Sequence, residues 1–166
     1  IPNAPNIMPA RIVTHRSQIH GNGVFAASDI PKGTRLIQYK GQLLTHEQSD
    51  RMYPDSADTG HTFLFVLNDD WVLDANREGN SARWINHSCD PNCEAVLLES
   101  SNGDSRRDRV YLEAIRDIAR GEELTYNYGI VLDVPHTPAM KRIWACRCGA
   151  PNCTGTILQP KRKKRG

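Results

Sequence analysis

The sequence predicts a mainly β domain with few short helices, built from several small sheets. Short apolar runs recur along the chain, and turn residues interrupt them about every 8–12 residues, a spacing typical of all-β domains. Very few segments have the periodicity of a helix. With 166 residues, 39% of them hydrophobic and 24% charged, the chain is long enough to bury a core without disulfides.

The predicted strands are short segments rich in β-branched, aromatic and other apolar residues. They are residues 11–13, 23–27, 35–39, 62–67, 71–73, 95–98, 110–114 and 123–126. Clusters of Gly, Pro, Asn and Asp separate them and favour tight turns at residues 21–23, 31–33, 68–70, 101–104 and 120–121.

Two segments are predicted to be helical, residues 45–52 and 81–86. In the first, Thr45 stands at the N-cap and Gln48 three residues later, which is the spacing of a capping box. We expect a Pro-rich arm (1–10) before the strand-rich body of residues 11–129. After this body we expect a linker with Pro135 and Pro138 (130–145), a cysteine-containing module (146–158) and a basic tail (159–166).

Composition and charge limit the classes of protein to which the chain can belong. No apolar run approaches the roughly 18 residues of a membrane helix, and no basic segment precedes an apolar one as in a secretory signal, so we expect an intracellular protein. The net charge is +2, but Lys161, Arg162, Lys163, Lys164 and Arg165 are consecutive. The remainder has 16 cations against 19 anions, a net −3. This balance favours a cationic substrate for the body and a polyanion contact, or simple solvation, for the tail.

The five cysteines are grouped. Cys146, Cys148 and Cys153 form a C-x-C-x4-C cluster, and an odd total argues against a closed set of disulfides. The cluster is typical of a zinc site that lacks its fourth ligand, which either Cys89 or Cys93 could supply. Buried, unligated cysteines are the alternative.

Three further segments are rich in residues that could bind a ligand. The first, His20-Gly21-Asn22-Gly23, lacks the third glycine of a dinucleotide-binding turn. Its two glycines would let backbone groups approach a small ligand closely. A plain hairpin turn would have the same sequence pattern. The second, residues 80–93, is dense in Asn, His, Ser and Cys and predicts an irregular, hydrogen-bonded loop.

The third segment, residues 121–129, places Tyr126 and Tyr128 on one face of an extended chain, where packing is the usual role of such a pair. In order along the chain come G-x-G, then Y-x-G at Tyr39, then N-H-S-C-D-P-N-C, then G-E-E-L-T-Y-N-Y-G and finally C-x-C-x4-C. This order resembles the SET-domain protein lysine methyltransferases that carry a post-SET zinc module, and the resemblance covers residues 11–158. It implies the SET fold over residues 11–129, with a C-terminal pseudoknot.

The resemblance also implies S-adenosylmethionine as methyl donor, structural zinc, and specific roles for residues. The implied cofactor-binding residues are His20, Gly21, Asn22, Gly23, Tyr39, Arg83, Asn86, His87, Tyr128 and Trp144. Tyr128, Tyr126 and Tyr39 are the implied catalytic residues, and Phe63 and Tyr126 are the implied residues of the substrate channel. For zinc, the family pattern selects Cys89 over Cys93, beside Cys146, Cys148 and Cys153.

Two departures bear on specificity: Gln38 stands where many members have Glu, and Phe63 where many have Tyr. Tyr126 implies mono- or dimethylation, since a phenol there holds a water beside the acceptor nitrogen. The expected substrate is a lysine in a basic histone-like or other nucleic-acid-associated protein, in the nucleus or on chromatin of a eukaryote, or in the cytoplasm, nucleoid or a host cell for a bacterium. Nucleic acid is a further expected contact of the tail. The alternative functions are a catalytically silent peptide or nucleic-acid binding module, or methylation of another target.

Overall fold

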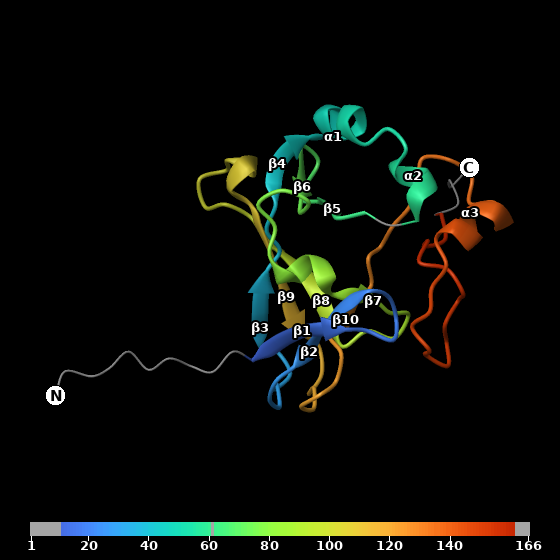
Figure 1. Ribbon diagram of the computed structural model, residues 1–166. Coiled ribbons are helices and arrows are strands. Elements are labelled where there is room, and N and C mark those ends of the chain that lie inside the picture. Colours follow the sequence, from blue (N-terminus) through green and yellow to red (C-terminus); the bar gives the residue numbers. More distant parts are fainter. Residues whose placement is uncertain (1–10, 61, 162–166) are drawn as a thin grey trace, which may run out of the picture.

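The computed structural model describes residues 11–60 and 62–161, and the chain is built mainly from short strands (Figure 1). The predicted fold class is therefore confirmed. The strands are β1 (Ile12–Arg16), β2 (Asn22–Ala26), β3 (Arg35–Gln38), β4 (Gln42–Thr45), β5 (Leu64–Val66), β6 (Trp71–Asp74), β7 (Asn86–His87), β8 (Cys93–Leu98), β9 (Arg109–Ala114) and β10 (Thr125–Tyr126).

The strands form four small sheets in the described part of the chain. Two are three-stranded and antiparallel, with the orders β3-β9-β8 and β4-β6-β5, and β1 pairs with β2 as a hairpin. The fourth sheet pairs β7 with β10 in parallel, although they lie nearly 40 residues apart in the sequence. Parallel neighbours cannot be joined by a tight turn, so the intervening chain must travel around them.

Side chains of the 86–93 segment hold this crossing together. The Asn92 side chain donates to the Glu123 carbonyl (2.8 Å) and accepts from the Thr125 N–H (2.8 Å). The Ser88 N–H donates to the Tyr126 carbonyl. The loop dense in Asn and Ser is thus fixed against the strand that carries the C-terminal tyrosines, which is why it needs polar side chains at buried positions.

The helices are short: α1 (His46–Met52), α2 (Ser56–Thr59) and α3 (Pro138–Ile143), with 3-10 turns η1 (Ser81–Trp84) and η2 (Ser105–Arg107). The capping box of α1 is present, because Thr45 accepts from the Gln48 N–H and the Gln48 side chain accepts from the Thr45 N–H. The predicted helix over 81–86 is wrong in its C-terminal part, because only the 3-10 turn η1 forms there. The Asn80 side chain caps this single turn, and Asn86 is already in β7.

The hydrophobic core lies between the β3-β9-β8 sheet, the β1-β2 hairpin and the crossing strands. Its fully buried members include Ile30, Ile85, Leu112, Ile118 and Leu124. Among the described residues, no helix has the length and apolar character needed to cross a membrane. The N-terminal arm and all of the tail beyond Lys161 lie outside the described residues.

Candidate functional site

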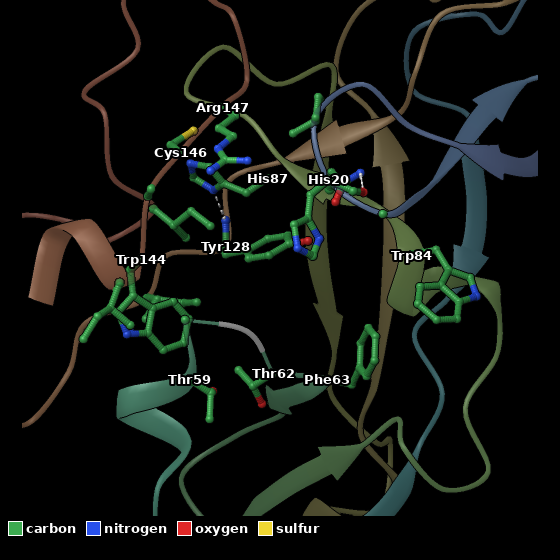
Figure 2. A pocket seen from close by; sticks show the side chains of 18 of the residues that line it. His20, Thr59, Thr62, Phe63, Trp84, His87, Tyr128, Trp144, Cys146 and Arg147 are labelled. Carbon is green, nitrogen blue, oxygen red and sulfur yellow. Dashed lines mark hydrogen bonds between the residues drawn. The ribbon is translucent and has the colours of Figure 1, made fainter.

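A first pocket of about 350 Å³ opens where the β1-β2 turn, the 81–87 segment and the C-terminal segment meet (Figure 2). Figure 2 shows His20, His87, Tyr128 and Trp144 around this space, although they come from distant parts of the sequence. Arg83, Arg142 and Arg147 line it as well, and none of the described residues in its wall is acidic. The pocket therefore suits a ligand that carries an anionic group.

One amide group holds the G-x-G turn in the wall of this pocket. The Asn86 Nδ2 group lies 3.1 Å from both the His20 and the Asn22 carbonyl oxygens and 2.8 Å from Glu123 Oε1. A Cβ at Gly23 would overlap the same Glu123 oxygen and lie 2.9 Å from the Ser17 Cβ, so a larger residue there would displace the carboxylate that Asn86 and Ser17 bind.

His87 and Tyr128 form the floor of the first pocket. The Tyr128 N–H donates to His87 Nδ1 (3.1 Å), and the two rings meet edge to face with centroids 5.4 Å apart. Burial lowers the pKa of His87 to about 4. The imidazole is therefore neutral near pH 7 and keeps Nδ1 free to accept this hydrogen bond.

A second pocket of about 800 Å³ lies beside the first. Its wall is formed by α1, α2, β5, the aromatic side chains Tyr39, Phe65 and Tyr126, and the segment 128–134. Val66, Val131 and Val134 are exposed on its rim, and Asp50 and Asp133 contribute carboxylates. Such a groove suits a chain with aliphatic stems and cationic ends.

The two pockets share a wall, made of Thr62, Arg83, Tyr128, Ile130 and Trp144. At this wall the Tyr128 hydroxyl donates to the Ile85 carbonyl oxygen at 2.6 Å, which fixes the phenol and leaves its oxygen lone pairs free to accept. A ligand in each pocket would therefore meet its neighbour beside Tyr128.

The aromatic side chains at this wall are closely packed. Tyr126 contacts Tyr128 with ring centroids 4.8 Å apart, and Tyr39 contacts Phe65 at the same distance. Burial raises the pKa of Tyr39, Tyr126 and Tyr128 well above 10, so all three remain neutral phenols at physiological pH. Neutral phenols can donate or accept a hydrogen bond without placing an anion in the site.

Arg83 has an unsatisfied group at the shared wall. Its Nη1 donates to the Ala75 carbonyl oxygen (3.0 Å), and the guanidinium lies 4.7 Å from the centre of the Trp84 ring. Its Nε is buried and has no hydrogen-bond partner among the described residues. An unmet buried donor of this kind costs about 1–3 kcal/mol, which a ligand acceptor would recover.

Trp144 closes the site from the C-terminal side. The side chain is buried, and its Nε1 donates to the Ala57 carbonyl oxygen of α2 at 2.8 Å. Next to it, a Cβ at Gly60 would lie 2.1 Å from the Ile143 carbonyl oxygen, so α2 and α3 touch through their backbones. Figure 1 shows this C-terminal segment lying beside α2.

Four cysteines gather at the end of the first pocket that Cys146 lines. The sulfurs of Cys89, Cys146, Cys148 and Cys153 all lie within 4.8 Å of one another, and those of Cys89 and Cys146 are 3.9 Å apart. A tetrahedral zinc with bonds of about 2.3 Å to sulfur needs its ligand sulfurs about 3.8 Å apart, so the four residues fit a zinc ion. Four thiolates leave no open position, which is the pattern of a structural site.

Cys93 lies outside this cluster. It is buried, and its thiol donates to Asn92 Oδ1 (3.4 Å). Burial raises its pKa to about 12. In the cluster, burial acts in the same direction on Cys148, but hydrogen bonds from the backbone of Cys89 and Ala150 outweigh it and lower that pKa to about 6.

The structure divides the residues named from the sequence between the two pockets. In the wall of the first pocket lie His20, Gly21, Asn22, Phe63, Arg83, Asn86, His87, Tyr128 and Trp144. Tyr39 and Tyr126 line the second pocket, and Gly23 lies behind the turn against Glu123. Phe63, expected in a substrate channel, lines the first pocket and packs edge to face on Trp84, while Phe65 lines the second pocket beside Tyr126.

Arg142, Arg147 and the α2–α3 contact were missed in the sequence. Thr137 caps α3 and Pro138 stands in its first turn, and this pair is a helix-start signal that could have located Arg142. Arg147 lies between two ligand-type cysteines, which fixes its backbone near the pocket. The contact at Gly60 has no signal in the sequence.

Comparison with known proteins identifies the fold and its relatives. The SET domain family matches residues 21–129. The histone-lysine N-methyltransferase trr of Drosophila melanogaster is 41% identical over 142 residues, which is 83% of this chain and 5% of the relative. The H3 lysine-4 specific histone-lysine N-methyltransferase of Saccharomyces cerevisiae is 36% identical over 86% of this chain and 13% of its own length. The chain thus spans a small part of these relatives.

Solved structures give the same result. A humanized mutant of Chaetomium thermophilum Polycomb Repressive Complex 2, bound to the inhibitor GSK126, has a TM-score of 0.61 and 35% identity over 71% of this chain and 15% of that one. The structure of ctPRC2 in an autoinhibited conformation, bound to S-adenosylmethionine, has a TM-score of 0.62 and 32% identity, and the match covers 72% of this chain and 15% of that one. Because the family match covers well over half of the chain, from the β1-β2 turn through Gly129 and including the crossing strands, the chain belongs to the SET-domain family.

Proposed function

We propose that this chain transfers methyl groups from S-adenosylmethionine to the side-chain nitrogen of a lysine in a basic protein. The observation that carries the proposal is the pair of pockets that share one wall at Tyr128. Relatives named as histone-lysine N-methyltransferases and a structural neighbour bound to S-adenosylmethionine support it.

The first pocket is the proposed site of the methyl donor. The three arginines and the unmet Nε of Arg83 suit the donor's carboxylate, and the backbone of the G-x-G turn and the neutral His87 suit its polar groups. When bound there, S-adenosylmethionine supplies a methyl group on a positively charged sulfur. Asn86 would act through the turn, because its amide nitrogen already lies near four acceptors, including Ser17 Oγ.

The second pocket is the proposed peptide groove. Tyr39, Phe65 and Tyr126 would pack around the aliphatic stem of the target lysine and guide its nitrogen toward Tyr128. Desolvation between these rings lowers the pKa of an ammonium and favours loss of its proton to water before transfer. The Tyr128 oxygen, held by its bond to Ile85, would accept weak C–H···O contacts and align the methyl group.

The cysteine cluster is the proposed zinc site, and its role is structural. Zinc on Cys89, Cys146, Cys148 and Cys153 would tie the C-terminal segment to the 86–93 loop, and so hold Trp144 and Arg147 in the wall of the first pocket. We place the substrate among histones or other nucleic-acid-associated proteins, since Asp50 and Asp133 at the groove favour a cationic chain. The corresponding location is chromatin.

Two measurements on the purified chain test this function. Calorimetry should detect binding of S-adenosylhomocysteine, the demethylated product, and isotope-labelled S-adenosylmethionine should label lysines in a panel of histones, bacterial DNA-binding proteins and ribosomal proteins. Product binding without transfer to any panel member would favour a catalytically silent binding module. Absence of both would refute the proposed function.

A further inference from the structure

His87 lies between the cysteine cluster and Tyr128. On one side its Nδ1 accepts from the Tyr128 N–H at 3.1 Å, and Figure 2 shows this hydrogen bond. On the other side its Nε2 lies 3.8 Å from Cys89 Sγ, within the longer reach of hydrogen bonds to sulfur. One imidazole ring therefore contacts both a proposed zinc ligand and the backbone of Tyr128.

The contact with Tyr128 fixes which ring nitrogen carries the proton. A nitrogen that accepts a hydrogen bond from an N–H is unprotonated, and a neutral imidazole has one protonated and one unprotonated nitrogen. The proton of His87 therefore stands on Nε2, which is the nitrogen close to Cys89 Sγ.

The other contacts of Cys89 Sγ do not supply a donor. Cys146 Sγ, at 3.9 Å, belongs to the cluster itself. The Thr154 hydroxyl lies 3.8 Å from Cys89 Sγ, but it donates its proton to the Thr156 carbonyl oxygen at 2.9 Å. Within the described residues, the donor left for the Cys89 sulfur is the Nε2–H of His87.

We propose that His87 is a positioning residue that couples the zinc site to the wall shared by the two pockets: its Nε2–H donates to the Cys89 thiolate while its Nδ1 holds the Tyr128 N–H. The inference rests on the proposed function, since it takes zinc on the four cysteines and methyl transfer beside Tyr128 as given. It adds a path from the metal site to Tyr128 that does not pass through the C-terminal segment.

The charge on Cys89 makes this contact depend on the metal. Cys89 must lose its proton to bind zinc, and its sulfur then carries negative charge. A hydrogen bond to a charged acceptor is roughly twice as strong as one to a neutral acceptor. The thiolate therefore favours the ring with its proton on Nε2, and this ring leaves Nδ1 free for Tyr128.

The surroundings of His87 transmit a movement of the ring. The side chain is buried, and His87 lies in β7 opposite Tyr126 of β10. Its ring also meets the ring of Tyr128 edge to face. A ring enclosed in this way cannot turn freely, so a displacement of Cys89 reaches Tyr128.

Two substitutions separate the two ends of His87. The Oδ1 atom of Asn can replace Nδ1 as an acceptor, and the amide N–H of Gln can replace Nε2 as a donor. His87→Asn therefore keeps the bond to Tyr128 and loses the donor to Cys89, whereas His87→Gln does the reverse. His15→Asn is the matched control, because His15 is exposed on β1 and lies outside both pocket walls and the cluster.

Measurements with metal alone test the Cys89 end. In competition with a chelator, His87→Asn should bind zinc about tenfold or more weakly than the unmutated chain, while His87→Gln and His15→Asn stay within about threefold. With Co²⁺ in place of zinc, the thiolate-to-metal charge-transfer band of His87→Asn should move to longer wavelength, because a hydrogen bond lowers the energy of the sulfur lone pairs. An unchanged band would overturn the inference even if zinc binding weakens, since a loss of packing alone could weaken it.

Nuclear magnetic resonance of the unmutated, zinc-loaded chain tests the ring directly, and it does so even if a variant fails to fold. The ring-nitrogen chemical shifts of His87 should show a protonated Nε2 and an unprotonated Nδ1. A protonated Nδ1 would overturn the inference.

Methyl transfer to a histone peptide tests the Tyr128 end. Excess zinc should restore the kcat of His87→Asn to within about threefold of the unmutated chain. His87→Gln should keep a kcat about tenfold or more below that of the unmutated chain at every zinc concentration. Restoration of both variants, or of neither, would overturn the coupling.

The two proposals fail separately in this design. Methyl transfer by the unmutated chain, together with an unchanged cobalt band in His87→Asn, would refute the coupling alone. A shifted band and weaker zinc binding, with no transfer to any protein, would refute the proposed function and leave the contact between His87 and the metal site standing. A chain that binds no zinc would refute the coupling and the zinc site, and the labelling assay would still decide whether it transfers methyl groups.

Discussion

At the scale of single residues, Tyr128 is predicted to take part in methyl transfer. Its side chain belongs to the wall that the two pockets share. Tyr128→Phe keeps the ring and its contact with Tyr126 but removes the oxygen bonded to Ile85. We expect kcat to fall by two to four orders of magnitude, with the affinity for S-adenosylhomocysteine within about threefold of the unmutated chain.

The lost hydrogen bond should also lower the free energy of unfolding by about 1–3 kcal/mol, because the Ile85 carbonyl oxygen is left unmet. Single-turnover kinetics, product calorimetry and thermal unfolding separate these effects. A full turnover number in the Phe variant would remove Tyr128 from the chemistry, whereas failure to fold would make its role one of packing.

Tyr126 is predicted to set the number of methyl groups. Its ring lines the second pocket, and no described residue bonds its hydroxyl, so a water there is the natural partner. Each added methyl must displace that water at a cost of about 1–3 kcal/mol for groups left unpaired. We therefore expect mono- or dimethyl product, and Tyr126→Phe should shift the product toward trimethyl-lysine.

Mass spectrometry of a peptide substrate under excess methyl donor measures this shift. Phe65 packs beside Tyr126, so Phe65→Leu is the control for a change of volume without loss of a hydroxyl. Efficient trimethylation by the unmutated chain would contradict the argument.

At the scale of elements, the zinc site is predicted to hold the C-terminal segment in place. Cys148→Ser should release about one zinc per chain and abolish methyl transfer, because Trp144 and Arg147 then lose their anchor. Cys93→Ser is the matched control: Cys93 is buried away from the cluster, so zinc content and most activity should remain. Elemental analysis gives the zinc content, and loss of zinc from the Cys93 variant with retention in the Cys148 variant would reverse the assignment.

The contact between α2 and α3 is predicted to keep the first pocket closed. Gly60→Ala forces a methyl group onto the Ile143 carbonyl oxygen and so displaces Trp144 from the Ala57 carbonyl oxygen. We expect the Kd for S-adenosylhomocysteine to rise about tenfold or more.

Gly103→Ala is the control for Gly60→Ala. Gly103 has a similar positive φ of 75°, against 65° at Gly60, but open space around its Cβ position. It therefore shares the backbone strain of about 1–2 kcal/mol without the clash. Calorimetry and thermal unfolding of both variants give the answer, and equal affinities in the two variants would show that the contact does not position Trp144.

The sequence predicts elements well where the signal is local. The Thr45–Gln48 capping box and the turn-bounded strands follow from neighbouring residues. The sequence did not predict strand β4, because Gly41 precedes it and its polar and apolar residues alternate only weakly. It did not predict β7, because the pairing of β7 with β10 depends on residues far along the chain. The same holds for the site: motifs indicated Tyr128, Asn86 and the cysteines, while Phe65 and Gly60 matter only through contacts that tertiary packing creates.

At the scale of the whole molecule, burial of three phenols in one place links the site to global stability. Tyr39, Tyr126 and Tyr128 have pKa values raised above 10 by burial, whereas the same phenols ionise near 10 in the unfolded chain. Between these values the folded chain binds more protons than the unfolded chain, so stability is full below pH 10 and falls as the pH rises above it.

The three groups act in the same direction, so their losses of stability add as the pH rises above 10. We therefore predict that these tyrosines ionise only as the chain unfolds. In an alkaline titration, the ultraviolet absorbance of their phenolates and the loss of far-ultraviolet circular dichroism should share one midpoint, above pH 10. Tyr126→Phe should make the fall of stability with pH less steep, because one linked proton is gone. Ionisation of all five tyrosines near pH 10 with the circular dichroism unchanged would mean that water reaches the wall between the two pockets in the folded chain.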